Sequence, residues 1–193
     1  MVDVRRGEVE RKTAETEIRV ELQIEGEGYA EVNTGIGFLD HMLRTLSRHS
    51  EMNLKVTASG DLTHHLVEDV AICLGLALSK ALGDRRGIRR FGYALIPMDE
   101  ALAFSSVDLI RRPYPIVSLN LSGGRVEDVA SEDLTHFLRS FIASLQATIH
   151  VKVLYGDNDH HKAEAAFKSL AIALRSAIQI VRPGSIPSAK DEM

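Results

Sequence analysis

The chain has 193 residues, which is enough for one domain with a proper core or for two small fused halves. Hydrophobic residues make up 45% of it and charged residues 26%, as is typical of a soluble globular protein. The net charge of -4 argues against general nucleic-acid binding, and no apolar run approaches the roughly 20 residues of a membrane span.

The first half of the sequence predicts three strands and two helices. Alternating apolar and polar residues, or a preceding glycine turn, predict strands at 18–24, 29–33 and 53–59. A first helix begins near Asp40, and a longer one with apolar residues at helical spacing runs from about 64 to 82. Gly83 is a suitable stop for the longer helix.

The second half repeats this order. Strands are predicted at 102–108, 116–121 and 148–154, and helices at 134–145 and about 160–181. The two halves meet in the charged, glycine-containing stretch 84–90, and a further strand can lie near this junction. Strands in one layer and helices in another predict an α+β fold whose two helix layers pack on each other.

The single cysteine, Cys73, lies in an apolar run, so we expect a buried, reduced core residue rather than a catalytic thiol. One cysteine cannot form a disulfide within the chain, which suits a reducing compartment. The N-terminal residues show no apolar signal region. We therefore expect a cytoplasmic protein.

The pattern Gly-Asp-x-x-His-His-x-x-Glu occurs twice in the sequence. Each copy supplies a histidine pair and a glutamate at equal spacing: His64, His65 and Glu68, and then His160, His161 and Glu164. A lone histidine precedes each copy at nearly the same distance, namely His41 and His136, and the residues after these two also match. The repeat predicts an internally duplicated protein with two equivalent sites.

Imidazole and carboxylate groups together are typical ligands of a transition-metal ion. Adjacent helical residues point about 100° apart, so His64 and His65 do not easily chelate one ion. The simplest arrangement is two ions, each taking one histidine from each pair, one glutamate and one lone histidine. Mixed nitrogen and oxygen ligation without thiolate favours Mn²⁺ or a similar ion. A single histidine pair would more often be a helix cap or a surface feature, and Asp61, Asp157 and Asp159 are expected to be turn or cap residues.

The chain resembles the imidazoleglycerol-phosphate dehydratases of histidine biosynthesis over residues 5–190. The resemblance is carried by the segments 11–16, 35–43, 64–69, 89–92, 97–101, 160–168 and 186–190. It implies a lyase that dehydrates D-erythro-1-(imidazol-4-yl)glycerol 3-phosphate to 3-(imidazol-4-yl)-2-oxopropyl phosphate, with two Mn²⁺ ions per active site. No extra phosphatase domain is seen, so the resemblance is to the monofunctional form.

The family resemblance also implies a fold and an assembly. One domain, residues 1–193, would consist of two repeats, about 1–86 and 87–193, each a four-stranded sheet with two helices on one face. The repeats would pack helix layer to helix layer. The protein would be a homo-oligomer, a hollow particle of 24 subunits with active sites shared between subunits.

By motif, the resemblance assigns roles to particular residues. The metal ligands would be His41, His64, His65, Glu68, His136, His160, His161 and Glu164, the residues that the repeat alone selects. The general base would be Glu15, with Glu17 as the local competitor; apart from the resemblance, Glu15 is an exposed glutamate at a strand start. The substrate and its phosphate would be bound by Arg90, Arg112, Lys168, Ser188, Lys190 and His49, with Arg89 and Arg111 ranked lower.

The expected chemistry follows from the substrate. Hydroxide is a poor leaving group, and the hydrogen to be lost is on an unactivated carbon. An imidazolate held between two cations can expel the hydroxyl through a diazafulvene-like intermediate, after which a base removes the proton. Three departures from the family pattern, Thr45, Thr63 and Ala189, touch neither a proposed ligand nor Glu15, but they put phosphate or glycerol contacts in doubt.

Two other hypotheses explain part of the sequence. A dimetal hydrolase would turn over phosphoesters and not imidazole glycerol phosphate. A metal-binding assembly protein without catalysis would leave Glu15 and the basic residues without a role. The pairing of ligands on each ion, and the subunit that supplies each ligand, stay open.

Overall fold

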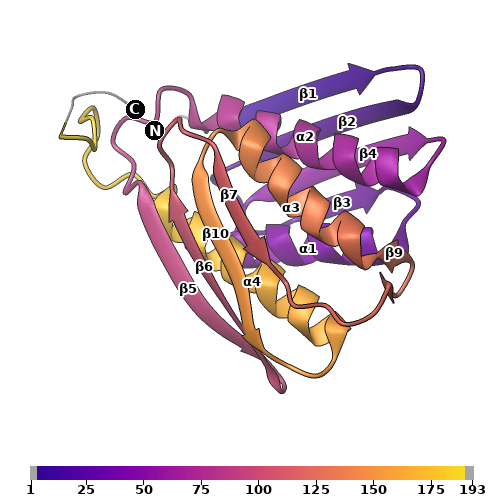
Figure 1. Ribbon diagram of the computed structural model, residues 1–193. Helices are drawn as coiled ribbons and strands as arrows, with labels where there is room; N and C mark the ends of the chain where they lie inside the picture. The colour runs from indigo at the N-terminus through magenta and orange to yellow at the C-terminus, as the bar shows by residue number, and fades with distance from the viewer. Residues whose placement is uncertain (1–3, 190–193) are drawn as a thin grey trace.

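The computed structural model describes residues 4–189 as two four-stranded sheets with four long helices between them (Figure 1). The first half runs β1 (Arg6–Lys12), β2 (Thr16–Gln23), β3 (Ala30–Asn33), α1 (Gly37–Ser50), β4 (Asn53–Gly60) and α2 (Thr63–Leu82). The second half runs β5 (Phe91–Met98), β6 (Ala101–Asp108), β7 (Tyr114–Ser118), β8 (Arg125–Val126), β9 (Val129–Ala130), α3 (Ser131–Leu145), β10 (Thr148–Tyr155) and α4 (Asp159–Ala177). No helix in this range is both long and apolar enough to cross a membrane.

The two halves share one topology. Their strand orders are β1-β2-β4-β3 and β5-β6-β10-β7. In each sheet the first two pairings are antiparallel and the last, β4 with β3 or β10 with β7, is parallel. The predicted α+β fold of two duplicated four-stranded halves is confirmed. The small β8-β9 hairpin is an addition to the second half.

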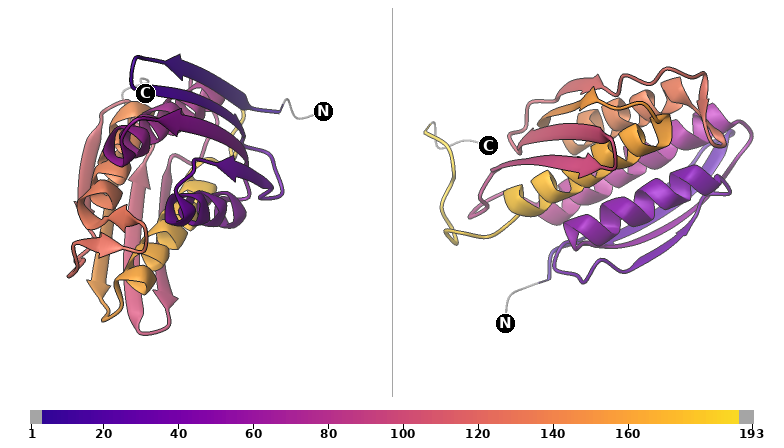
Figure 2. Two further views of the ribbon diagram at one scale, coloured as in Figure 1. Left: turned by 90° about the vertical axis from the view of Figure 1, so that its right-hand side faces the viewer. Right: turned by 90° about the horizontal axis from the view of Figure 1, so that it is seen from below.

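The helix layers of the two halves pack on each other, with α2 against α3 and α1 against α4, so that the sheets lie outside (Figure 2). The rings of Phe137 and Phe167, both fully buried, meet at a centroid distance of 5.7 Å between α3 and α4. Cys73 is buried in the same core, as expected, and burial raises the pKa of its thiol to about 11.

Close contact between sheet and helix is itself repeated. A Cβ on Gly7 of β1 would overlap the carbonyl oxygen of Ala77 in α2, and a Cβ on Gly92 of β5 would overlap that of Ala173 in α4. Glycine at these two equivalent strand positions therefore allows each long helix to approach its own sheet.

The pattern analysis gave no bounds for the first strand of either sheet, although it expected a further strand near the junction of the halves, where β5 lies. The reasons are opposite for the two strands. In β1 only Gly7 and Val9 are buried and the other side chains are mostly charged, so the alternation is too short to recognise. In β5 the exposed face carries Phe91, Tyr93 and Leu95, so both faces are apolar and the alternation disappears.

Helix ends also differ from those predicted, because partners distant in sequence determine them. Helix α1 begins at Gly37, before Asp40, since the carboxylate of Asp128 accepts hydrogen bonds from the N–H groups of Gly37 (2.6 Å) and Phe38 (2.9 Å). Helix α4 ends at Ala177 rather than near residue 181, since the N–H of Arg90 donates to the carbonyl of Ala177.

Candidate metal centres

Six of the eight predicted ligands form two clusters. We call His41, His160 and Glu164 the α4 centre, and His64, Glu68 and His136 the α2 centre. In each, one ligand atom from every residue lies within 4.8 Å of the others. Each centre combines a lone histidine from one half with the pair histidine and glutamate of the other half, so the packing of α1 on α4 and of α2 on α3 builds both.

In the α4 centre a buried carboxylate lies between two imidazoles. Oε2 of Glu164 is 3.3 Å from Nε2 of His41 and 3.4 Å from Nε2 of His160. The other oxygen, Oε1, accepts from Nζ of Lys168 at 2.6 Å. Burial raises the pKa of Glu164, but the hydrogen bonds from Lys168 and His41 outweigh it and hold the pKa below its usual value. Glu164 therefore stays an anion, as a metal ligand must.

In the α2 centre Nε2 of His136 lies 3.0 Å from Oε1 of Glu68 without hydrogen-bond geometry. This ring nitrogen is buried and has no hydrogen-bond partner in the part of the chain that the structure describes. The ring of His64 stacks on that of His136 at a centroid distance of 5.1 Å. A buried imidazole nitrogen that lies beside a carboxylate without forming a hydrogen bond to it is what a shared cation would satisfy.

All four pair histidines have a carboxylate against Nδ1, which the sequence analysis did not predict. The partners, in chain order of the histidines, are Asp133 for His64 (2.6 Å), Asp61 for His65 (2.9 Å), Glu127 for His160 (3.1 Å) and Glu100 for His161 (2.7 Å). Such contacts fix the tautomer and leave Nε2 free to ligate, as is usual for metal-bound histidine. Only Asp61, four residues before His65, could have been found from spacing. The residues of both centres therefore fit divalent metal ions.

His65 and His161 lie outside the two clusters. Nδ1 of His65 is also 3.6 Å from Oε2 of Glu15, and Nε2 of His161 is 3.6 Å from Oδ2 of Asp99. The hydrogen bonds to Asp61 and Glu100 raise the pKa of His65 and of His161, respectively. Within one chain, each centre is one imidazole short of the expected three.

Glu15 lies in the turn between β1 and β2, which is held in place by hydrogen bonds. Oγ1 of Thr13 accepts from the N–H groups of Glu15 (3.1 Å) and Thr16 (3.0 Å), and Oγ1 of Thr16 donates to Asp69 of α2 at 2.5 Å. The side chain of Glu15 is exposed and next to His65, whereas Glu17 pairs with Lys12 on the strands. The fixed backbone thus presents Glu15 beside the histidine that the α2 centre does not use.

The predicted phosphate-binding residues are divided between two places. Lys168 contacts the α4 centre. The half-buried His49 of α1 lies near Lys168; burial lowers the pKa of His49, and the positive charge of Lys168 lowers it further. Arg90 contacts the last residue of α4, 17 residues after His160, which corresponds to about 25 Å along the helix.

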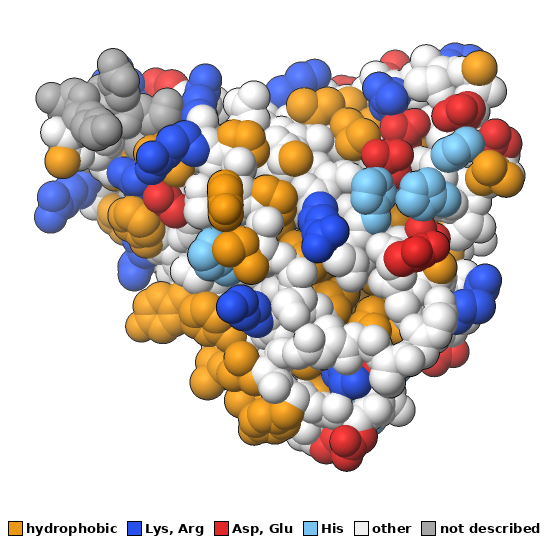
Figure 3. All heavy atoms as spheres, viewed as in Figure 1, with side chains coloured by type: hydrophobic (Ala, Val, Ile, Leu, Met, Phe, Trp, Pro, Cys, Tyr) orange, Lys and Arg blue, Asp and Glu red, His pale blue; other side chains and the backbone are white. Residues whose placement is uncertain are grey.

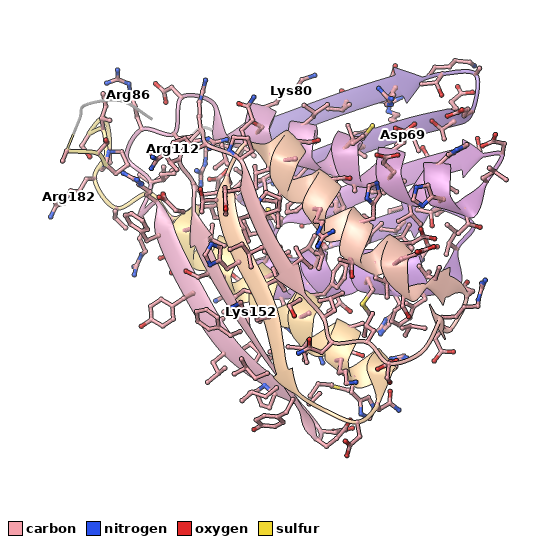
Figure 4. All side chains as sticks on the ribbon, viewed as in Figure 1. Asp69, Lys80, Arg86, Arg112, Lys152 and Arg182 are labelled. Carbon is pink, nitrogen blue, oxygen red and sulfur yellow. The ribbon has the colours of Figure 1, made fainter. Side chains whose placement is uncertain are left out.

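Arg112 and Ser188 lie at the same distant end as Arg90. Figure 4 shows Arg112 on the side of the molecule that carries Arg86 and Arg182, away from Asp69. Ser188 belongs to the tail next to Arg90, whose Nη1 donates to the carbonyl of Pro187 at 2.8 Å. Lys190 lies outside the described residues. One chain therefore does not bring Arg90, Arg112 and Ser188 to either histidine cluster.

An open pocket of about 580 Å³ adjoins the α4 centre and is lined by Gly37, Phe38, His41, Glu127, Asp128 and His160. It gives a small polar molecule access to the imidazoles of this centre. Of the predicted cationic residues that the structure describes, Lys168 is the one that contacts this centre and could bind an anionic group on that molecule.

Comparison with known proteins gives consistent results. The family model described as imidazoleglycerol-phosphate dehydratase matches residues 34–174. Proteins with this name from Methanothermobacter thermautotrophicus and Chloroherpeton thalassium are each 48% identical to the chain; the first alignment covers 100% of both sequences, the second 91% of this chain and 92% of the relative. A crystal structure of the Pyrococcus furiosus enzyme superposes with a TM-score of 0.83 at 39% identity, covering 96% of this chain and all of that one. The Staphylococcus aureus enzyme gives 0.83 at 32% identity, covering 92% of this chain and 99% of that one.

Proposed function

The chain belongs to the imidazoleglycerol-phosphate dehydratase family, and on this premise we propose how it works as a lyase of histidine biosynthesis. The proposed reaction removes water from D-erythro-1-(imidazol-4-yl)glycerol 3-phosphate and yields 3-(imidazol-4-yl)-2-oxopropyl phosphate. The observation that carries the proposal is the pair of imidazole–carboxylate centres, each assembled from both halves of the duplicated chain. Residues 1–193 would be one dehydratase domain of two repeats, about 1–86 and 87–193, located in the cytoplasm.

The α4 and α2 centres would each hold one divalent ion, which we propose to be Mn²⁺. His41, His160 and Glu164 would ligate one ion, and His64, Glu68 and His136 the other. When bound, two such ions supply Lewis acidity that stabilises the imidazole ring in its anionic form and so favours departure of the hydroxyl. The carboxylates on Nδ1 keep the ligating rings oriented.

We propose Glu15 as the base that takes the proton from the carbon next to the departing hydroxyl. Its carboxylate is exposed, its backbone is fixed by the Thr13 hydroxyl, and it lies beside His65. A general base must lie within hydrogen-bond reach of one particular hydrogen, so a defined position is required. Glu15 and His65 would be delivered to an active site together.

We propose that copies of the chain complete each other's active sites. His65 and His161 lie outside the centres of their own chain, and Arg90 contacts α4 at a residue about 25 Å along the helix from His160. A neighbouring copy can supply both the missing imidazole and the missing phosphate-binding cations. The number of subunits, 24, is proposed from the family resemblance.

The two outer sheet faces differ in a way that supports self-association. The outer face of the first sheet is charged, with Glu8, Glu10, Arg19 and Glu21 forming ion pairs across it. On the second sheet, hydrophobic side chains gather over β5 (Figure 3), including Phe91, Tyr93 and Leu95, which are 57%, 76% and 54% exposed. Exposed hydrophobic side chains gathered on one strand are typical of a surface that is buried in an assembly.

An assay with imidazole glycerol phosphate, run beside an assay with simple phosphoesters, tests the proposed reaction. We expect dehydration of the imidazole substrate and no phosphoester turnover. Phosphoester hydrolysis without dehydration would instead support a dimetal hydrolase.

A further inference from the structure

The internal repeat aligns the two metal centres residue by residue, and two aligned positions differ in chemistry. His41 is equivalent to His136, so Phe38 and Asp133, three residues before them, are equivalent. His64 is equivalent to His160, so Ile72 and Lys168, eight residues after them, are equivalent as well. The ligands are thus repeated, but the residues that surround them are not.

Asp133 orients a ligand of the α2 centre from a rigid position. It lies on α3, the helix that carries His136, and is 5% exposed. Its Oδ1 is 2.6 Å from Nδ1 of His64. A short hydrogen bond from Nδ1–H to a buried carboxylate fixes the ring and makes Nε2 a stronger ligand for a cation.

Among the described residues, the α4 centre has no buried carboxylate in this role. Phe38 occupies the position of Asp133 and places its ring 5.0 Å from the ring of His160. Nδ1 of His160 is met instead by Glu127, at 3.1 Å, from the turn between β8 and β9. The side chain of Glu127 is 60% exposed, so solvent competes for this contact.

Lys168 adds a second difference. Its Nζ is 2.6 Å from Oε1 of Glu164, so the ammonium group and a metal ion would bind the same carboxylate. The positive charge of the ammonium group also repels a nearby cation. In the α2 centre the equivalent residue is Ile72, which carries no charge, and Glu68 has no lysine contact of this kind among the described residues. Both differences favour stronger cation binding at the α2 centre than at the α4 centre.

We propose, on the basis of the proposed metal function, that the two centres are unequal: the α2 centre holds its ion more tightly, and the α4 centre holds an exchangeable one. Asp133 is the positioning residue of the tight centre, and Lys168 is the residue that weakens the other. The exchangeable ion is also the one beside the open pocket.

The test is a Mn²⁺ titration of the full-length, chelator-stripped protein, in which free Mn²⁺ is measured by its electron paramagnetic resonance. We expect two classes of one site per chain that differ by at least about tenfold in affinity. Asp133→Asn should weaken the tight class about 10- to 100-fold, the usual effect of removing the partner of a ligating histidine. Glu132→Gln makes the same charge change on the neighbouring exposed residue and should leave both classes unchanged.

Two further variants act on the weak class. Lys168→Met should strengthen it, and Glu127→Gln should weaken it, each without effect on the tight class; these variants test the inference even if Asp133→Asn does not fold. A single class of sites in the parent protein, or an unchanged weak class in Lys168→Met, would overturn the inequality while leaving the metal function in place. Absence of any Mn²⁺ binding would overturn the metal function as well.

Discussion

Arg90 and Asp108 form a two-pronged ion pair in which Nε donates to Oδ1 at 2.7 Å and Nη2 donates to Oδ2 at 3.0 Å. This contact raises the pKa of the Arg90 guanidinium. Nη1 donates to the carbonyl of Pro187, so two of the five N–H groups remain for a ligand. Asp108 thus orients Arg90, and Arg90 in turn holds the tail that carries Ser188.

If Arg90 binds the substrate phosphate, removal of its orienting partner should weaken substrate binding more than catalysis. For Asp108→Asn we expect KM to rise roughly tenfold with kcat nearly unchanged, the pattern of lost uniform binding. Steady-state kinetics measure both constants. Asp84→Asn, which removes an exposed ion pair with Arg86, is the control, and an unchanged KM in Asp108→Asn would contradict the role of Arg90.

Glu15→Gln should abolish dehydration while bound metal and substrate affinity stay as in the parent protein. The amide keeps the size of the side chain but accepts no proton, and loss of a general base costs about 10²- to 10⁴-fold in rate. The comparison variant is Glu17→Gln, two residues along the chain, which should retain activity. Near-parental turnover by Glu15→Gln would remove Glu15 from the mechanism.

Asp159 should contribute stability that is lost in acid. Burial raises the pKa of its carboxyl, but hydrogen bonds from Lys162, Gly123 and Ser122 outweigh burial and hold the pKa at about 2 instead of 3.8. Because the folded-state pKa is lowered, the contribution is present above pH 4 and lost as pH falls towards 2.

Asp159→Asn should therefore lower the free energy of unfolding at pH 7 by about 2 kcal/mol and flatten its decline between pH 4 and 2. Denaturant titrations at several pH values measure this. Asp157→Asn, at an exposed position nearby, should leave the curve as it is. An equal acid response in the parent and in Asp159→Asn would refute the assignment.

Gly92→Ala should destabilise the second half, because the added Cβ meets the backbone of α4 at Ala173 and the helix must move. Overpacking of this kind costs about 1–3 kcal/mol, measured by thermal or chemical unfolding. Gly124→Ala adds the same methyl group where no atom lies within 4 Å, and should cost far less. Equal effects of the two substitutions would show that the sheet–helix contact is not tight.

Local patterns predicted most of the fold, because helical and alternating periodicities record which side faces the core. They did not locate β1, whose exposed face is charged and whose buried face is short, or β5, which is apolar on both faces. They also misplaced the start of α1, which depends on Asp128, about 90 residues away. No local pattern contains a partner that distant.

The candidate site shows the same limit. Duplication of the sequence identified six residues that the structure brings into two clusters, because equivalent helices of the two halves carry them. Helical spacing also predicted that His64 and His65 do not share one ion, and the structure places His64 but not His65 in a cluster. Asp133, Glu127 and Glu100 were not found, since each reaches its histidine from a segment 33 to 69 residues away. Each cluster also takes residues from both halves of the chain, and this depends on how the helices of the two halves pack.

The central claim is that the two imidazole–carboxylate centres hold metal ions on which both catalysis and assembly depend. The most direct measurement follows bound metal, dehydration of imidazole glycerol phosphate and particle size before and after chelation and Mn²⁺ return. We expect two ions per chain, loss of activity and dissociation into smaller particles on stripping, and recovery of both when Mn²⁺ returns, because ligands from several copies meet at each ion. A verified metal-free protein that keeps its particle size and still dehydrates the substrate would contradict the account.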